Sequence, residues 1–356
     1  MQLFIPELFL NDPQLKTTFV SRFGRRELTL FSLYLSIPGT VVCSIVADYK
    51  SLLLSRALIG FCIGLSFSTP CVMMAELASN RTILHDILMI SATMYAVGGV
   101  WSSVLGYLLL DLIGWRIFLL LTSLPFFIPP IFMLHFCFLG TSPKIKKENT
   151  QKLQNGTETA PNFVARTTKL GLFCGISSFQ GWLTILLVPT MIHMLNIKKA
   201  EPNSDCSVTV TQGSELLLLG IVSSASSFGK LFRHSINNMI SFRKSQVIAA
   251  LLNVVAFTAM LEVGMDRLVG IVLSNFMVKF LFGFSSMAQT YIQADIDYFG
   301  AENFALGSGI SCAIGMAGGM LGTAMVAFTP ISYVIITALM ISALNVPLVL
   351  CMSEVK

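Results

Sequence analysis

The sequence predicts an all-α membrane protein with about ten transmembrane helices. Residues 303–353 contain no charged side chain, which is a run of fifty-one positions. A helix crosses a bilayer core about 30 Å thick with roughly 20 apolar residues, so this run holds two helices with a bend at Thr329-Pro330. The whole chain is 54% hydrophobic and 12% charged, with a mean hydropathy of +0.76. An average soluble domain has about 25% charged residues.

Apolar runs of the required length recur along the whole sequence. They predict ten spans, at residues 28–47, 52–75, 87–110, 117–139, 170–195, 214–233, 245–262, 268–294, 304–329 and 331–352. The span at 214–233 has the weakest pattern, because it is rich in serine and ends in Lys230 and Arg233. An even number of spans puts both termini on the same side of the membrane.

The distribution of basic residues predicts which side that is. Cytosolic loops of membrane proteins carry an excess of Lys and Arg. With the termini in the cytosol, sixteen of the 23 basic residues lie on the cytosolic side, including those at 230–244, and six lie on the other side. The remaining one, Lys279, lies within a predicted helix. The bias therefore predicts cytosolic termini.

A polar segment separates the spans into two groups. Residues 140–169 are rich in Lys, Asn, Gln and Thr and lack an apolar period, which indicates a flexible linker. The predicted organisation is a cytosolic N-terminal segment at 1–27, an N-terminal bundle of four helices at 28–139, a cytosolic linker at 140–169 and a C-terminal bundle of six helices at 170–356.

The two groups share a short repeated pattern. Arg56 is followed by Gly60 four positions later, and Lys279 by Gly283, and each glycine precedes a phenylalanine. Repeated halves joined by a polar linker are typical of secondary transporters, in which the substrate site lies near the membrane midplane.

Further motifs lie in order along the chain. They are Gly24-Arg25-Arg26, Arg56-x-x-x-Gly60-x-x-x-Gly64, Ala75-Glu76, Gly114-Trp115-Arg116, Ser142-Pro143-Lys144, Lys279-Phe280 followed by Tyr291 and Asp297, and Ala305-Leu306-Gly307-Ser308-Gly309. With this set the sequence resembles the major facilitator superfamily, and most closely its branch of sugar porters, organic ion transporters and synaptic-vesicle-protein-related transporters. The resemblance implies two pseudo-symmetric helical bundles and alternating-access transport of a small organic solute, either an organic ion or a sugar-like molecule.

The chain also departs from the family pattern. The superfamily has twelve helices, and counting back from Gly24-Arg25-Arg26 the first helix and most of the second are missing. The resemblance therefore implies a truncated N-terminal bundle. The alternative is a non-transporting family member, or an incomplete gene model, that acts as a membrane interaction or regulatory protein. The face left exposed by truncation would need a partner, for which a second copy in a homo-oligomer is one candidate.

Ionisable and polar residues inside the spans are the candidate binding residues. A charge at membrane depth costs about 3 kcal/mol or more unless it is paired or solvated. Lys279 is the first candidate, because its ammonium could hold an organic anion or a substrate carboxylate. The other candidates are Gln180, Trp182, Asn275, Gln289, Tyr291 and Arg56. The alternatives are a structural cation satisfied by a carbonyl or by snorkelling, and polar side chains that bond helix to helix.

The resemblance also implies a cytosolic gate. Its residues are Arg25, Arg26, Glu76 and Asp297, in which cations at one helix end face acids at another. Positive-inside anchoring explains the two arginines equally well.

Other classes of function lack a pattern in this sequence. The four histidines are scattered without a second ligand at metal spacing, and neither a P-loop nor a Gly-x-Ser-x-Gly motif occurs. We therefore predict no enzyme activity, no metal and no cofactor. Basic residues form short clusters and no single face, so a nucleic-acid partner is not expected. The expected partners are a small organic solute and the lipid bilayer, in a plasma membrane or an intracellular vesicle membrane.

Overall fold

The computed structural model describes residues 25–77, 80–132, 135, 163–199, 212–236, 239–262, 268–299 and 303–352. These residues form helices, with no strand among them. Seven of the described helices are long and apolar enough to cross a membrane. Each of the ten predicted spans overlaps a helix. The prediction of an all-α membrane protein is confirmed.

The chain divides into two compact units, each described by itself below. Unit 1 comprises Met1–Leu77 and Leu109–Thr157, and unit 2 comprises Ala78–Leu108 and Glu158–Lys356.

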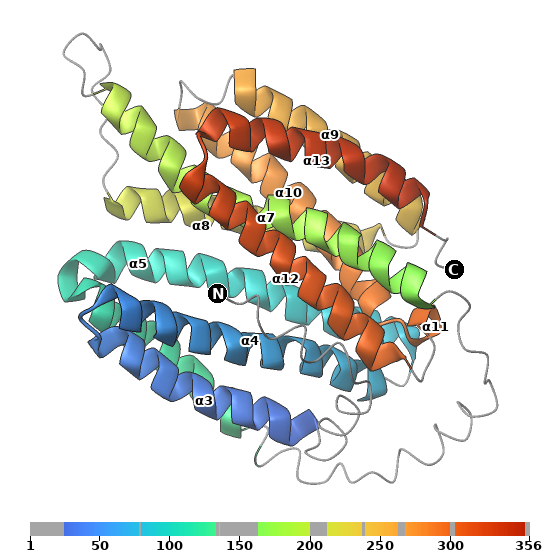
Figure 1. Cartoon of the computed structure of the whole chain (residues 1–356), viewed down its shortest axis with the longest axis horizontal. Coiled ribbons are helices and arrows are strands. Elements are labelled where there is room, and N and C mark those ends of the chain that lie inside the picture. The colour runs from blue at the N-terminus through green and yellow to red at the C-terminus, as the bar shows by residue number, and fades with distance from the viewer. Residues whose placement is uncertain are drawn as a thin grey trace. The chain divides into compact units, whose positions relative to one another are not determined.

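Unit 1 is built on a pair of helices joined by a tight turn. Helix α3 (Arg25–Ile45) packs along α4 (Tyr49–Leu77), as Figure 1 shows. Asp48 caps the N-terminus of α4, because its Oδ2 accepts hydrogen bonds from the Ser51 N–H at 2.9 Å and from the Ser51 hydroxyl at 3.0 Å. These bonds hold the pKa of the Asp48 carboxyl below its usual value.

Helix α5 (Arg81–Phe132) is broken at one residue. Gly114 has φ 72° and ψ 158°, a backbone conformation that favours glycine because a Cβ atom would clash there. The break lies at the Gly114-Trp115-Arg116 motif, between the predicted spans at 87–110 and 117–139. Past the break, the Arg116 guanidinium donates a hydrogen bond to the Val46 carbonyl at 3.2 Å, which ties this part of α5 to the end of α3.

Unit 2 contains the first part of α5 and all the later helices. These are α7 (Phe163–Lys199), α8 (Gln212–Ser235), α9 (Phe242–Glu262), α10 (Leu268–Gln293), α11 (Ile296–Phe299), α12 (Phe304–Phe328) and α13 (Ile331–Leu350). Helix α7 packs on α12, α8 on α10 and α9 on α13, and α10 also contacts α7 and α9 (Figure 1). Helix α7 begins at Phe163, inside the segment expected to be a linker.

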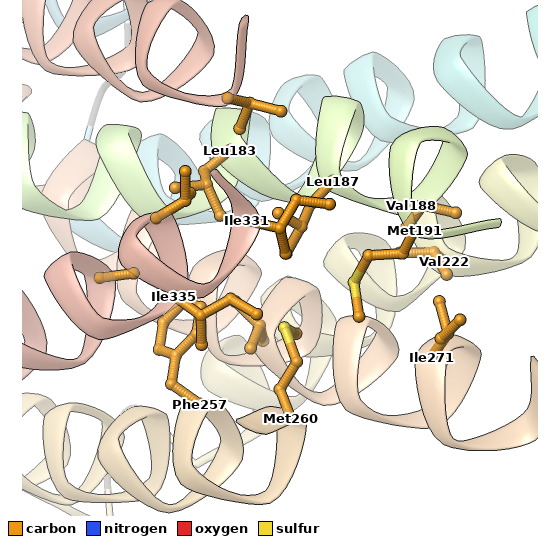
Figure 2. Packing of buried hydrophobic residues seen from close by; sticks show 14 of the residues in the cluster. Leu183, Leu187, Val188, Met191, Val222, Phe257, Met260, Ile271, Ile331 and Ile335 are labelled. Carbon is orange, nitrogen blue, oxygen red and sulfur yellow. The ribbon is translucent and has the colours of Figure 1, made fainter. Parts of the chain in front are cut away.

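The core of unit 2 is an apolar cluster to which six helices contribute: α7, α8, α9, α10, α12 and α13. Figure 2 shows Leu187 and Met191 of α7 near Phe257 of α9, Ile271 of α10 and Ile335 of α13. All of these side chains are buried. Because α10 shares this core with α7 and α9, its position is fixed along its length, and the polar residues it carries are held against neighbouring helices.

Two glycines bring the backbones of α8 and α10 into direct contact. A Cβ atom at Gly229 would collide with the Phe280 carbonyl oxygen, and one at Gly283 would collide with the Ser226 carbonyl oxygen. Small residues at helix interfaces permit this close approach in membranes. The contact therefore requires glycine on both helices.

We expect Gly283→Ala to destabilise the protein. Alanine favours a helix over glycine by up to about 1 kcal/mol, but the added methyl group meets backbone atoms that cannot rotate away, and overpacking costs about 1–3 kcal/mol. The measurement is the thermal midpoint of the purified protein in detergent. Gly309→Ala on α12 is the matched control, because nothing lies within 4 Å of its added Cβ. Equal midpoints for the two variants would contradict the close contact.

Candidate functional site

Lys279 is buried near the middle of α10. The residue is 6% exposed, and its Nζ donates a hydrogen bond to the Gly181 carbonyl of α7 at 2.7 Å. The ammonium also lies 5.1 Å from the centre of the Phe282 ring, within the range of a cation–π contact. Both partners are neutral, so the charge of Lys279 is solvated but not neutralised.

A second lysine is buried on the neighbouring helix. Lys230 of α8 is 6% exposed and donates a hydrogen bond from Nζ to the Ala92 carbonyl of α5 at 2.7 Å. Its ammonium lies 5.6 Å from the centre of the Tyr95 ring. Lys230 and Lys279 lie on neighbouring helices, because α8 packs against α10. Two buried lysines therefore lie on this pair of helices, and each is hydrogen-bonded to a further helix, Lys230 to α5 and Lys279 to α7.

Arg233 adds a third cation one turn along α8. Its side chain is 2% exposed, and its guanidinium lies 5.6 Å from the centre of the Phe284 ring of α10. Its Nε and Nη1 atoms have no hydrogen-bond partner among the described residues. A buried N–H without a partner costs about 1–3 kcal/mol, and more when the group is charged. These two donors are therefore available to an acceptor that is not part of the described chain.

The three buried cations share one property. None of Lys230, Arg233 and Lys279 forms an ion pair with an acid among the residues that the structure describes. Buried charges in proteins are usually paired or bound to a ligand. An anion at this place would supply the missing negative charge, so the arrangement is suited chemically to binding carboxylate, sulfonate or phosphate groups.

A polar network joins α7 to α9 and α13. Gln180 donates a hydrogen bond from Nε2 to the Ser342 hydroxyl at 2.6 Å, and its Oε1 accepts one from Asn253 Nδ2 at 3.3 Å. All three side chains are buried. Gln180 therefore uses both ends of its amide group between helices.

The other predicted residues of α7 and α10 differ in their surroundings. Trp182 is 40% exposed and lies against Gly319 of α12. Asn275 is buried and donates a hydrogen bond to the Ile271 carbonyl at 2.8 Å, but its Oδ1 has no partner among the described residues. Gln289 is also buried, and its Nε2 has no partner in the described part of the chain. These two amides therefore offer one acceptor and one donor.

Tyr291 joins a cluster of ionisable side chains from three helices. Its hydroxyl lies 2.7 Å from Nδ1 of His234, at the end of α8. The other ring nitrogen of His234, Nε2, lies 3.4 Å from Oδ1 of Asp86 on α5. The His85 ring, also from α5, lies 4.2 Å from the Tyr291 ring, centroid to centroid. The two histidines that look isolated in the sequence are brought together here.

The remaining predicted residues belong to other helices. Arg56 is an exposed residue of α4 in unit 1. Arg25 and Arg26 begin α3, Glu76 is in the last turn of α4, and Asp297 is in α11. The side chains of these four candidate gate residues lie outside the described part of the structure.

Sequence reasoning did not select five residues of this site as functional: Lys230, Arg233, His85, Asp86 and His234. Lys230 and Arg233 were counted among the basic residues at the cytosolic end of a span, but the structure places both inside α8 and buries them. A signal was nevertheless present, because His85-Asp86 and Arg233-His234 are adjacent ionisable pairs near the ends of two apolar runs.

Comparison with known proteins supplies a family. The model of the Major Facilitator Superfamily matches residues 17–323 of this chain. A curated protein of Caenorhabditis elegans, "Putative transporter svop-1", is 28% identical over 128 residues, which make up 35% of this chain and 24% of that protein. The match therefore spans about a quarter of the length of that relative.

We expect Gln180→Leu to lower stability. The substitution removes two hydrogen bonds between helices and leaves Ser342 and Asn253 without them, which costs about 1–2 kcal/mol. Thr258→Val on α9 is the control, because the Thr258 hydroxyl is exposed and bonds only within its own helix. Thermal midpoints in detergent measure both effects. A Gln180→Leu midpoint equal to that of the control would show that the network adds no stability.

Proposed function

Because the chain belongs to the Major Facilitator Superfamily, we propose that it is a secondary transporter that moves a small organic anion across a membrane by alternating access. One observation carries this proposal, namely the burial of Lys279 near the middle of α10 with a carbonyl and an aromatic ring as its partners. An ionisable residue inside a membrane span is by default a hypothesis for a functional site. The name of the relative, which calls it a transporter, agrees with this assignment.

The charge balance of the site favours an anion over a neutral sugar. Lys230, Arg233 and Lys279 are buried in one pair of packed helices, and none has an acid partner among the described residues. Sugar hydroxyl groups would accept hydrogen bonds from these cations but would leave their charge uncompensated. A carboxylate or a sulfonate accepts hydrogen bonds from these cations and also compensates their charge. Bound in a region of low dielectric, it gains a stronger electrostatic attraction than it would in water.

The other candidates lie along the proposed path of the solute. The Oδ1 of Asn275, one turn before Lys279 and without a partner among the described residues, would orient a polar group of the bound solute. Gln289 and Tyr291 lie further along α10, so they and Trp182 would contact the solute elsewhere on its path. Gln180 positions α7, which supplies the carbonyl partner of Lys279. In the same proposal Arg56 guides the anion from solvent, while Arg25, Arg26, Glu76 and Asp297 form the cytosolic gate.

The test of the proposal compares anions with neutral molecules of the same shape. Benzoate, succinate and benzenesulfonate are each paired with the corresponding amide, and the thermal midpoint of the full chain in detergent reports binding. Radiolabelled uptake into proteoliposomes reports transport. We expect at least one anion to raise the midpoint and to be taken up, and its amide to do neither.

Lys279→Met tests the site itself. The loss of a hydrogen bond to a charged group costs about 1.5–3 kcal/mol, so we expect the affinity for the bound anion to fall at least about tenfold. The variant itself should be as stable as the native protein or more so, because it no longer buries an unneutralised charge. Lys244→Met on α9 is the control, because Lys244 is exposed.

Two outcomes would contradict the proposal. Equal binding of anions and amides would show that the site does not select its ligand by charge. An unchanged affinity in Lys279→Met would show that Lys279 does not bind the anion. A chain that binds and transports none of the anions would favour the alternative, a family member that acts as a membrane interaction or regulatory protein.

A further inference from the structure

His234 is held between two groups of different hydrogen-bonding character. The Asp86 carboxylate, which faces Nε2, can only accept hydrogen bonds, whereas the Tyr291 hydroxyl, which faces Nδ1, can donate or accept. Neutral His234 therefore satisfies both neighbours with its hydrogen on Nε2 and with the Tyr291 O–H donating to Nδ1. The site is complete without an added proton.

The same site can also accept a proton without movement of its heavy atoms. A proton added to Nδ1 makes both ring nitrogens donors, and the Tyr291 oxygen then accepts from Nδ1 while its own hydrogen turns away. The Nε2–H···Asp86 contact becomes an ion pair, which is stronger than the neutral contact. The side chains of His234 and Asp86 are 29% and 52% exposed, so protons can reach them from solvent.

The charged and titratable groups around His234 come from every helix packed against it. Helix α5 contributes Asp86 and His85, and α10 contributes Tyr291. On α8 itself, Arg233 interacts electrostatically with Tyr291, and Lys230 lies one turn earlier. Of these groups, Asp86 is the acid that faces Nε2, and Arg233 is a buried cation next to His234 in sequence. Histidine is also the side chain whose ordinary titration falls between about pH 5 and pH 8.

We propose that His234 is a proton-binding site. When a proton is bound, the ion pair between His234 and Asp86 stabilises the packing of α5 against α8 and α10. The ligand of this site is a proton from solvent, which forms the N–H bond at Nδ1 and breaks none. The site lies on the two helices that carry the buried cations, so proton binding would regulate anion movement. That last consequence rests on the proposed function, whereas the proton site itself does not.

The first test observes the site directly. The chain has four histidines, so nitrogen-15 NMR of imidazole-labelled full chain in lipid nanodiscs gives few resonances, and His234→Asn assigns those of His234. Between pH 8 and pH 5 we expect them to change from the neutral form with hydrogen on Nε2 to the imidazolium form. A ring that stays neutral throughout this range would overturn the proposal.

The second test measures how far the protonated site stabilises the packing of α5. The ion pair forms only in acid, so the thermal midpoint should gain about 1 to 3 °C from it on going from pH 8.0 to pH 5.5. His234→Asn and Asp86→Asn should each lose this gain. His193→Asn should keep it, because His193 is an exposed residue of α7 outside the cluster. A gain that persists in His234→Asn and Asp86→Asn would overturn the proposal.

A third measurement separates the two proposals. Benzenesulfonate stays ionised between pH 5.5 and pH 8.0, so its binding reports on the cation site at both values. One outcome is that benzenesulfonate and the other anions fail to bind, while His234 titrates and the rise of the thermal midpoint in acid depends on Asp86. The proposed anion site is then wrong and the proposed proton site is supported. If an anion binds through Lys279 while His234 does not titrate, the reverse holds.

Discussion

The close backbone contact between α8 and α10 is the constraint on which the rest of unit 2 depends. Gly229 and Gly283 allow each helix to meet a carbonyl oxygen of the other, and the cations lie at or near these glycines in sequence. Lys230 follows Gly229 directly, and Lys279 lies one turn before Gly283. A larger residue at either glycine would separate the helices and give the lysine side chains room to reach solvent. The same contact that packs the helices therefore keeps their charges buried.

Burial of three cations without an acid partner in the described part of the chain is not explained by stability. Each lysine gains one hydrogen bond to a carbonyl and one aromatic ring, and Arg233 leaves two donors unused. A hydrogen bond from a charged group contributes about 1.5–3 kcal/mol net, whereas the desolvation of a buried charge costs several kcal/mol. Apolar side chains of similar size would pack the same interface at lower cost. The arrangement is therefore better suited to binding an anion than to holding two helices together.

The sequence is sufficient to predict the helices, but it predicts only some residues of the candidate site. Hydrocarbon-length apolar runs indicate helices because a lipid-exposed backbone must satisfy its own hydrogen bonds, and Lys279 is evident as a charge in the middle of such a run. Its partner, the Gly181 carbonyl, depends on how α7 packs against α10, which has no sequence signature. The burial of Lys230 and Arg233 follows from helix packing, whereas a count of basic residues near span ends assumes that they face water. His85 and His234 are far apart in sequence and meet only through the tertiary fold.

The two proposed sites are linked through Arg233. Tyr291, which faces His234, lies twelve residues beyond Lys279 on α10, or about 18 Å along the helix. Two unit charges at that separation interact by up to about 1 kcal/mol at an effective dielectric constant of about 20. The guanidinium of Arg233 lies against Phe284, between Lys279 and Tyr291 along α10. A proton on His234 therefore adds repulsion among the cations, and an anion bound to them relieves it. Because linkage is reciprocal, an anion that binds more tightly to the protonated chain must also tighten proton binding at His234 by the same factor.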